Sequence, residues 1–501
     1  MIVTTAHPSR SYEVKQAASD LGALAALLLT ALITRAVWFG DPVAGFDEQI
    51  YSFVGWRITQ GDLPYVDLWD RKPFGLFLIF TAAHAAFGPE AIAYQIVAFL
   101  FALGGSWLVR SISLSLVDRF SATVAGVLYL LLLAAYGGDS GQTEVFHTPL
   151  MLLMAWLVID WRRNDAVERA LLAMLVGGLA LQVKYTVLPQ CAFFGAYALW
   201  GRWRAGGSFI ELAGLSLAFA ILGLLPTALI AGWFAAQGEF PAFWFANFVS
   251  FFSREPSEFG RFWPGHISGA LPIAVLIFAG AYASLRLNPP RDWRLSAFFG
   301  GWALAAFASV ILPSTTYLYY YGALAAPAVL VALPLIDRHS PAKWIPAALL
   351  VLSLLWIVNP AERYEHAKSE RLAEQRLSAA VSPFVGRNEN CLYVFDGPTV
   401  LYRTTNSCLP TRFIYPDHLN NALERNALGV SQGAEVRRIL STRPGVIVTA
   451  SVPVTPQCKE CLALVKNATN ADYRPLITIS QYDRAITAWV RRDISQVAPA
   501  R

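Results

Sequence analysis

Long runs without Asp, Glu, Lys or Arg dominate the first 360 positions of the chain. The first covers residues 21–40 and is interrupted only by Arg35. The later runs lie at 91–109, 120–138, 145–159, 170–183, 185–201, 212–238, 266–285, 295–336 and 344–360. A membrane-spanning helix needs about 20 mostly apolar residues. The pattern therefore predicts a polytopic α-helical membrane protein, in which the segment 313–316 divides the longest run into two helices.

One short apolar segment, residues 74–88, decides the topology of the whole chain. If it spans the membrane, Arg110, Arg119 and most other loop arginines fall on the outer side. If it is re-entrant or lies in the interface, they fall on the cytoplasmic side. Cytoplasmic loops carry an excess of Lys and Arg. We therefore expect about eleven spans plus interfacial helices, with the N-terminus inside and the C-terminus outside.

This topology predicts three parts of the chain. Residues 1–19 form a cytoplasmic N-terminus. Residues 20–360 form the transmembrane domain, with a first outer loop at 41–90 and a long outer loop at 233–265. Residues 361–501 are polar and form a small α/β domain on the outer, periplasmic side.

The polar tail holds four of the five cysteines, and such an even number on an oxidising face predicts disulfides. Four cysteines allow three pairings, of which the short loops favour Cys391–Cys408 and Cys458–Cys461. A zinc site is the weaker alternative, since a zinc ribbon needs two close cysteine pairs. Alternating apolar positions at 392–395 and 446–448 predict strands, and residues 433–441 predict a helix between them.

Composition agrees with a membrane protein. Hydrophobic residues make up 55% of the 501 positions and charged residues only 15%, whereas soluble domains carry about 25% charged residues. The same figures exclude a disordered chain. The net charge of +5 resides in short loops between apolar runs, so it predicts topology and no nucleic-acid partner.

The densest polar signal lies in the first outer loop. Asp47 follows the first span by about seven residues, which places it at the outer lipid–water boundary. Residues 48–60 predict a helix in the interface, with Asp47 and Tyr51 on one face. Asp47 is either a functional carboxylate or a helix N-cap. Lys72 is either a phosphate partner or a lysine that snorkels to the interface.

A second group of polar residues surrounds the next outer loop. Asp139, Glu144 and His147 border a span and bind either sugar hydroxyls or a divalent cation, unless they form a solvated loop. No metal is otherwise expected. Lys184 interrupts two apolar runs at the outer end, which costs free energy unless its ammonium group is paired.

The late outer loops are rich in aromatic residues. The loop at 233–265 carries Arg254 and Arg261 among many Phe and Trp side chains, which suit a lipid-contacting lid or an aromatic belt. Residues 317–321 contain four tyrosines, including Tyr320, whose hydroxyls either reach a phosphate or sugar or belong to a tyrosine belt.

The first outer loop resembles that of the GT-C glycosyltransferases. The resemblance is narrowest to family-39-like bacterial members, which are related to aminoarabinose transferases and protein O-mannosyltransferases. It rests on Asp47-Glu48 with Tyr51, then on Gly61 to Tyr65, Asp67 to Asp70, and Lys72-Pro73. It extends more loosely over about residues 20–360. It implies a GT-C fold.

The resemblance also implies a function. A hexosyl or pentosyl transferase of this kind moves one sugar from a polyprenyl-phosphate donor to an acceptor on the periplasmic side of a bacterial inner membrane. The acceptor is lipopolysaccharide, another envelope glycan, a lipid or a protein. Asp47 is expected to be the general base of an inverting reaction, because a positioned carboxylate can take the proton of the attacking hydroxyl.

The expected contacts follow from these roles. Lys72, Arg254, Arg261 and Tyr320 are expected at the donor phosphate. The expected sugar or acceptor contacts are Glu48, Tyr51, Asp139, Glu144, His147 and Lys184. Aminoarabinose transferases carry a Glu just before the Lys-Pro element, where this sequence has Arg71, so any role of that Glu cannot be transferred.

Two other functions stay open. A transporter or flippase of lipid-linked glycans needs a polar path through the membrane, and the apolar runs carry no chain of ionisable residues. A polymerase or ligase takes a diphosphate lipid donor and would be expected to show more cationic outer residues. The charges gather on one face, which favours chemistry at the outer surface.

Overall fold

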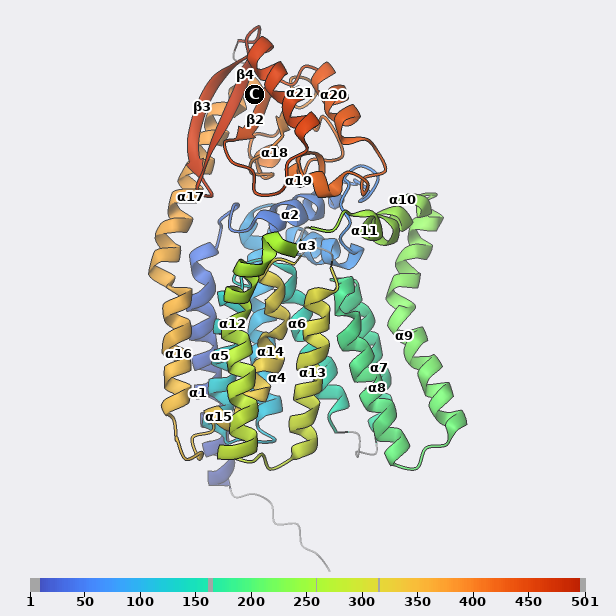
Figure 1. Cartoon of the computed structure of the whole chain (residues 1–501), viewed down its shortest axis with the longest axis vertical. Helices are drawn as coiled ribbons and strands as arrows, with labels where there is room; N and C mark the ends of the chain where they lie inside the picture. Colours follow the sequence, from blue (N-terminus) through green and yellow to red (C-terminus); the bar gives the residue numbers. More distant parts are fainter. Residues whose placement is uncertain (1–9, 161–164, 258, 314–315, 496–501) are drawn as a thin grey trace, which may run out of the picture.

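The computed structural model describes residues 10–160, 165–257, 259–313 and 316–495, with the side chains of 10–17 and 259–268 excepted. A bundle of roughly parallel helices supports a smaller domain at one end (Figure 1). The bundle helices are α1 (Arg10–Arg35), α4 (Ala91–Ser113), α5 (Arg119–Ala135), α6 (Thr143–Val158), α7 (Ala166–Leu181), α8 (Leu188–Arg204), α9 (Phe209–Ala236), α12 (Phe259–Tyr282), α13 (Trp293–Ile311), α14 (Ala325–Val331), α15 (Leu333–Ile336) and α16 (Ile345–Val358).

Several of these helices suit a membrane environment. Within the described residues, 6 helices are long and apolar enough to span a bilayer, and further apolar helices are shorter. Helix α9 exposes Leu217, Ile221 and Leu224, which is favourable in lipid because hydrocarbon is as apolar as leucine. The chain is therefore an integral membrane protein, and the number of eleven spans stays a prediction.

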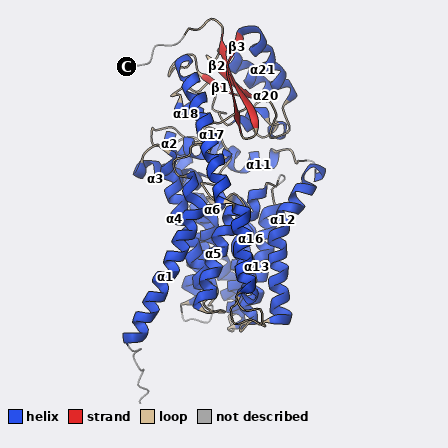
Figure 2. Ribbon diagram, turned by 90° about the vertical axis from the view of Figure 1, so that its left-hand side faces the viewer, coloured by secondary structure: helices blue, strands red, loops and turns tan. Residues whose placement is uncertain are grey.

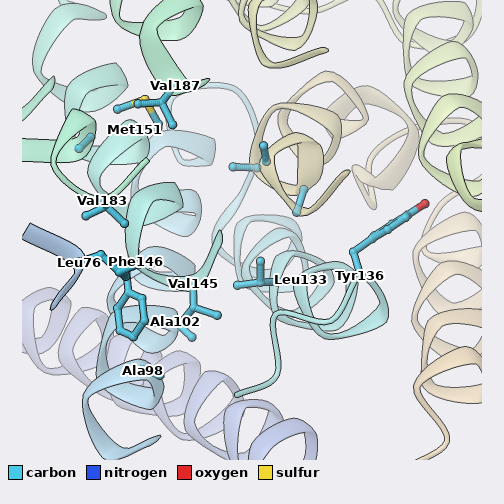
Figure 3. Close-up of a cluster of buried hydrophobic side chains, with 14 of the residues drawn as sticks. Leu76, Ala98, Ala102, Leu133, Tyr136, Val145, Phe146, Met151, Val183 and Val187 are labelled. Atoms are coloured by element: carbon cyan, nitrogen blue, oxygen red, sulfur yellow. The ribbon is translucent and has the colours of Figure 1, made fainter. Parts of the chain in front are cut away.

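The interior of the bundle is closely packed around α4, α5 and α6. Ala98 and Ala102 of α4 lie beside Phe146 of α6, while Leu133 and Val145 fill the adjacent space (Figure 3). All five side chains are almost fully buried. Small residues on α4 let the bulky neighbours approach, which is how membrane helices gain van der Waals packing without a hydrophobic driving force.

Two helices lie across one end of the bundle, between it and the smaller domain (Figure 1). They are α2 (Phe46–Ile58) and α3 (Phe74–Phe87). Gly55 of α2 allows them to touch, because a Cβ there would lie 2.6 Å from the Cβ of Phe80. This is the position expected for an apolar segment that does not cross the membrane. Short helices of the late outer loop, α10 (Phe240–Trp244) and α11 (Ser250–Ser253), lie at the same end.

Helix α2 differs from the predicted interfacial helix in one respect. An interfacial helix has one wet face, but eight consecutive residues of α2, Glu48 to Gly55, are buried. The reason is that the C-terminal domain covers this helix. Gln49 donates a hydrogen bond to the hydroxyl of Tyr482 at 2.9 Å and accepts one from the Val400 backbone at 3.2 Å.

The C-terminal domain contains a four-stranded mixed sheet in the order β1-β2-β4-β3 (Figure 2). Its strands are β1 (Leu392–Val394), β2 (Val446–Ala450), β3 (Tyr473–Gln481) and β4 (Arg484–Arg491). Strand β1 is parallel to β2, and β4 is antiparallel to both β2 and β3. The helices are α17 (Pro360–Val381), α18 (Leu401–Thr404), α19 (Pro416–Asn420), α20 (Gln432–Ser441) and α21 (Lys459–Asp472). A small α/β arrangement is thus present, as predicted.

Some of these elements were not predicted. Helix α17 continues upward from α16 after Asn359, which adopts a left-handed conformation with φ of 40° (Figure 1). Its polar sequence gave no apolar period to read. Strands β3 and β4 were also missed, β3 because it combines Pro475 with several exposed side chains. The disulfides Cys391–Cys408 and Cys458–Cys461 are both present.

Candidate active site

A cavity of about 270 Å³ lies between α2, the late outer loops and the C-terminal domain. Its walls come from five separate stretches of sequence: residues 46–51, 70–72, 254, 317–320 and 396–455. They meet because α2 crosses the end of the bundle and the C-terminal domain closes over it. The volume suits a small ligand.

Asp47 is the central carboxylate of this cavity. It stands in the first turn of α2 but is not its N-cap, because Gly45 occupies that position and makes no side-chain capping bond. Three tyrosine hydroxyls donate to it. Tyr51 and Tyr319 reach Oδ2 at 3.1 and 2.9 Å, and Tyr415 reaches Oδ1 at 2.8 Å. The predicted pairing of Asp47 with Tyr51 on one helix face is therefore observed.

This arrangement leaves Asp47 able to accept one more hydrogen bond. An ionised carboxylate has about four acceptor positions. Among the described residues, two hydroxyl donors occupy Oδ2 and one occupies Oδ1. The remaining position on Oδ1 is available to a ligand hydroxyl, which is the geometry a general base requires.

Lys72 stands beside Asp47, as the sequence suggested. Its Nζ lies 3.8 Å from Asp47 Oδ2 and 5.2 Å from the centre of the Tyr51 ring. Asp70 fixes the preceding turn by accepting a hydrogen bond from the Lys72 backbone at 2.8 Å. The ammonium group thus has a defined position on the cavity wall, where it can attract an anion.

Asp70 and His418 connect this turn to the C-terminal domain. Their side chains lie 3.7 Å apart, and both are buried. Burial alone would raise the pKa of Asp70, but the hydrogen bond from His418 and the charge of Lys72 hold it below its usual value. Burial lowers the pKa of His418, and Asp70 opposes this effect. The pair fastens the wall that carries Lys72.

Two arginines that line the cavity share one carboxylate. Arg254 Nε lies 2.7 Å from Oε1 of Glu424, and Arg71 pairs with Oε2 of the same side chain. Arg254 Nη2 also donates to the hydroxyl of Tyr317 at 3.5 Å. Burial, together with the nearby charge of Arg254, lowers the pKa of Arg71 to about 10. Arg254 and Tyr320 line the cavity as predicted. The side chain of Arg261 is outside the described residues.

The second group of predicted polar residues lies behind the cavity and does not line it. Glu48 points away from Asp47 and accepts a hydrogen bond from the Gly141 backbone. Asp139 accepts from Trp38 Nε1 at 2.9 Å and pairs with Arg363 of α17. Neither Glu48 nor Asp139 lines the cavity, and their contact with a sugar or acceptor stays a prediction.

Glu144, Lys184 and His147 are also withdrawn from the cavity. Glu144 pairs with Lys184, whose Nζ lies 3.8 Å from the centre of the Tyr320 ring. His147 is buried one turn further along α6. Each carboxylate of the suggested Asp139/Glu144 cation site thus already has a basic partner. Both side chains are thus engaged with basic partners in this structure, and the divalent cation at Asp139 and Glu144 stays a prediction.

Several residues of the cavity could not be found from the sequence. Tyr415, Asp417, His418 and Glu424 all come from the C-terminal domain, where no motif marks them. Burial raises the pKa of Asp417, and the charge of Arg254 opposes this effect. Arg71 had a signal, since it stands directly before the Lys-Pro element, but its partner Glu424 is more than 350 residues away in the chain.

Comparison with known proteins identifies the fold. No model of a known family and no curated protein matches the sequence. The structure is similar to ArnT from Cupriavidus metallidurans in the apo state, with a TM-score of 0.66 and 14% identity over 94% of this chain and 98% of ArnT. The same protein bound to undecaprenyl phosphate gives 0.64 and 15% over 98% and 100%. An oligosaccharyltransferase from Archaeoglobus fulgidus gives 0.47 and 11% over 85% and 67%. The two ArnT structures show that this chain shares the fold of ArnT.

Proposed function

We propose that this protein is a glycosyltransferase that moves a single sugar, a hexose or pentose, from a polyprenyl-phosphate donor to an acceptor. The observation that carries the proposal is Asp47. It is held by three tyrosine hydroxyls beside Lys72, with an acceptor position open, in a cavity at one end of a membrane bundle. A carboxylate next to a cation matches a reaction that deprotonates a hydroxyl and releases a phosphate.

The proposed reaction is a single displacement. The acceptor hydroxyl donates to Oδ1 of Asp47 and attacks the anomeric carbon as Asp47 takes its proton. The bond from that carbon to the phosphate oxygen breaks, and the polyprenyl phosphate leaves with the electron pair. Lys72 and Arg254 stabilise the negative charge on this leaving group. One displacement inverts the anomeric centre, and no step in it requires a metal ion.

The donor and the location are part of the proposal. ArnT, whose fold this chain shares, has been solved with undecaprenyl phosphate bound, which supports a polyprenyl-phosphate partner here. We place the cavity and residues 361–501 on the periplasmic side of a bacterial inner membrane, with residues 1–19 in the cytoplasm, because the loops at the opposite end carry the excess of arginine. The acceptor is lipopolysaccharide, another envelope glycan, a lipid or a protein.

The test compares polyprenyl-phosphate lipids and envelope glycans by mass spectrometry in cells with and without the gene. In the cells without the gene, we expect a monoglycosylated carrier lipid to accumulate and one sugar to disappear from an envelope acceptor. The proposal would be contradicted if deletion of the gene left both pools unchanged under conditions in which the wild type expresses the protein. Accumulation of a complete oligosaccharide on a diphosphate lipid would instead indicate a polymerase or ligase.

The role of Asp47 is tested by complementing the deletion with Asp47→Asn. We expect transfer to fall by about 10²–10⁴-fold, the usual contribution of a general base, while undecaprenyl phosphate still binds. Asp62→Asn is the matched control, because Asp62 lies in the same loop, pairs with Arg57 and does not line the cavity. Full transfer by the Asp47 variant would remove Asp47 from the mechanism. If the wild-type protein transported the lipid across the membrane but transferred no sugar, it would be a flippase.

A further inference from the structure

Glu424 of the C-terminal domain lies between two arginines of the membrane domain. Arg254 Nε is 2.7 Å from one carboxylate oxygen, and Arg71 pairs with the other. The three side chains are only 5%, 13% and 17% exposed, respectively. Among the described residues, Arg71, Lys72 and Arg254 are the Arg and Lys side chains that line the cavity. Two of these three cations therefore share one carboxylate from another domain.

A phosphate group and this carboxylate would compete for the same guanidinium groups. Both anions present paired oxygens to the forked donors of arginine. A phosphate placed beside Arg254 while Glu424 stays would put two anions next to each other in a buried site, where their repulsion is strong. The donor phosphate and the carboxylate of Glu424 therefore exclude each other.

We infer that Glu424 is a displaceable counter-ion of the donor phosphate site. It holds Arg71 and Arg254 in place when the site is empty, and the donor phosphate releases it on binding. This inference rests on the proposed function.

The attachment of Glu424 links this exchange to Asp47. Glu424 ends a short turn whose Leu423 carbonyl accepts a hydrogen bond from the Glu255 backbone at 2.9 Å. The turn follows directly after α19, which is preceded by Tyr415, a partner of Asp47. Release of Glu424 would loosen the contact between the two domains near the general base. Binding of the donor phosphate would thereby be coupled to the position of Asp47.

The experiment uses the full chain in lipid nanodiscs and undecaprenyl phosphate as the probe. We expect Glu424→Gln to lower the dissociation constant for undecaprenyl phosphate by about tenfold, because the competing charge is removed. The lipid-free variant should unfold at a lower temperature than the wild type, and the lipid should raise its unfolding temperature by more. Glu460→Gln is the control, since Glu460 pairs with Arg437 at 2.7 Å on the exposed surface of the same domain.

The outcomes separate this inference from the proposed function. Unchanged or weaker binding by Glu424→Gln, while the wild type binds, would overturn the counter-ion role only, because Glu424 would then simply orient the arginines. Failure of both proteins to bind would overturn the counter-ion role together with the proposed donor. If Glu424→Gln does not fold, Glu424→Asp carries the test. The Glu424→Asp variant has a shorter side chain that reaches the arginines less well. It should therefore also bind the lipid more tightly than the wild type, by a smaller factor than Glu424→Gln.

Discussion

Two clusters of charged residues lie at the end of the bundle that faces the C-terminal domain, and they are built differently. In the buried cluster, Glu144 pairs with Lys184 and Asp139 pairs with Arg363. In the cavity, Asp47 is held by neutral hydroxyls, and Glu424 is shared by two arginines. In the buried cluster, each carboxylate forms an ion pair with its own basic partner. The cavity keeps an open acceptor position on Asp47 and, as we infer, an exchangeable anion in Glu424, which is what binding and catalysis need.

The comparison also shows how neighbours in sequence can serve different purposes. Asp47 faces the cavity, whereas Glu48 faces the loop at Gly141. Burial raises the pKa of Glu48 to about 8, so its carboxyl group is mostly neutral at pH 7. One carboxylate performs the proposed chemistry, and the next fixes the start of α2 to the bundle.

Breaking the buried cluster should have the largest effect on stability. Lys184→Met leaves Glu144 buried without its partner, which costs about 3–5 kcal/mol. Thermal unfolding in detergent measures the loss. Lys466→Met, at an exposed position of α21, is the control, and the double variant Lys184→Met with Glu144→Gln should recover part of the loss. If Lys184→Met were as stable as the wild type, the ion pair of Glu144 and Lys184 would not contribute to stability.

Removing the ammonium group of Lys72 should affect donor binding and leave the fold intact. We expect Lys72→Met to weaken undecaprenyl phosphate binding by roughly tenfold or more, because a charged hydrogen bond contributes about 1.5–3 kcal/mol. Titration of the lipid measures this, with Lys459→Met on the exposed surface of the C-terminal domain as the control. Equal affinities would exclude Lys72 from the phosphate site.

Changing one hydroxyl donor of Asp47 should have a smaller effect on catalysis. Tyr415→Phe removes the 2.8 Å hydrogen bond to Oδ1, and we expect the transfer rate kcat to change by several-fold up to about tenfold. Tyr393→Phe is the matched control, since the Tyr393 hydroxyl is buried without a hydrogen-bond partner in the described structure. A similar response of both variants would indicate a general effect on the C-terminal domain.

The smallest effect concerns pH and Glu48. Its folded-state pKa of about 8 exceeds the ordinary value of 4.5, so the folded protein binds more protons between these values. Its contribution to stability is complete below about pH 4.5 and is lost as pH rises toward 8. Glu48→Gln should therefore flatten the decline of the unfolding temperature between pH 5 and 8, whereas Glu90→Gln, at an exposed site, should not. An unchanged slope would contradict the burial of Glu48 as the cause.

Much of the architecture was accessible from the sequence because membranes impose local rules. Apolar length predicted the bundle helices, and the position of arginines predicted that residues 74–88 stay at the outer end. Cysteine spacing favoured the two pairings that the structure contains. Strand β3 was missed because Pro475 and exposed side chains interrupt its apolar alternation. Strand β4 was missed although buried positions alternate regularly along it.

The sequence by itself determined the membrane character of the chain, the GT-C resemblance, and Asp47 and Lys72 as candidates, because each depends on residues close together in one loop. Only the tertiary structure decided which polar residues share a cavity. Glu424 meets Arg71 and Tyr415 meets Asp47 because the C-terminal domain closes over α2, and contacts between such distant segments leave no periodic signal. Burial likewise decided that Glu144 and Lys184 pair with each other, since an uncompensated charge could not remain in that interior.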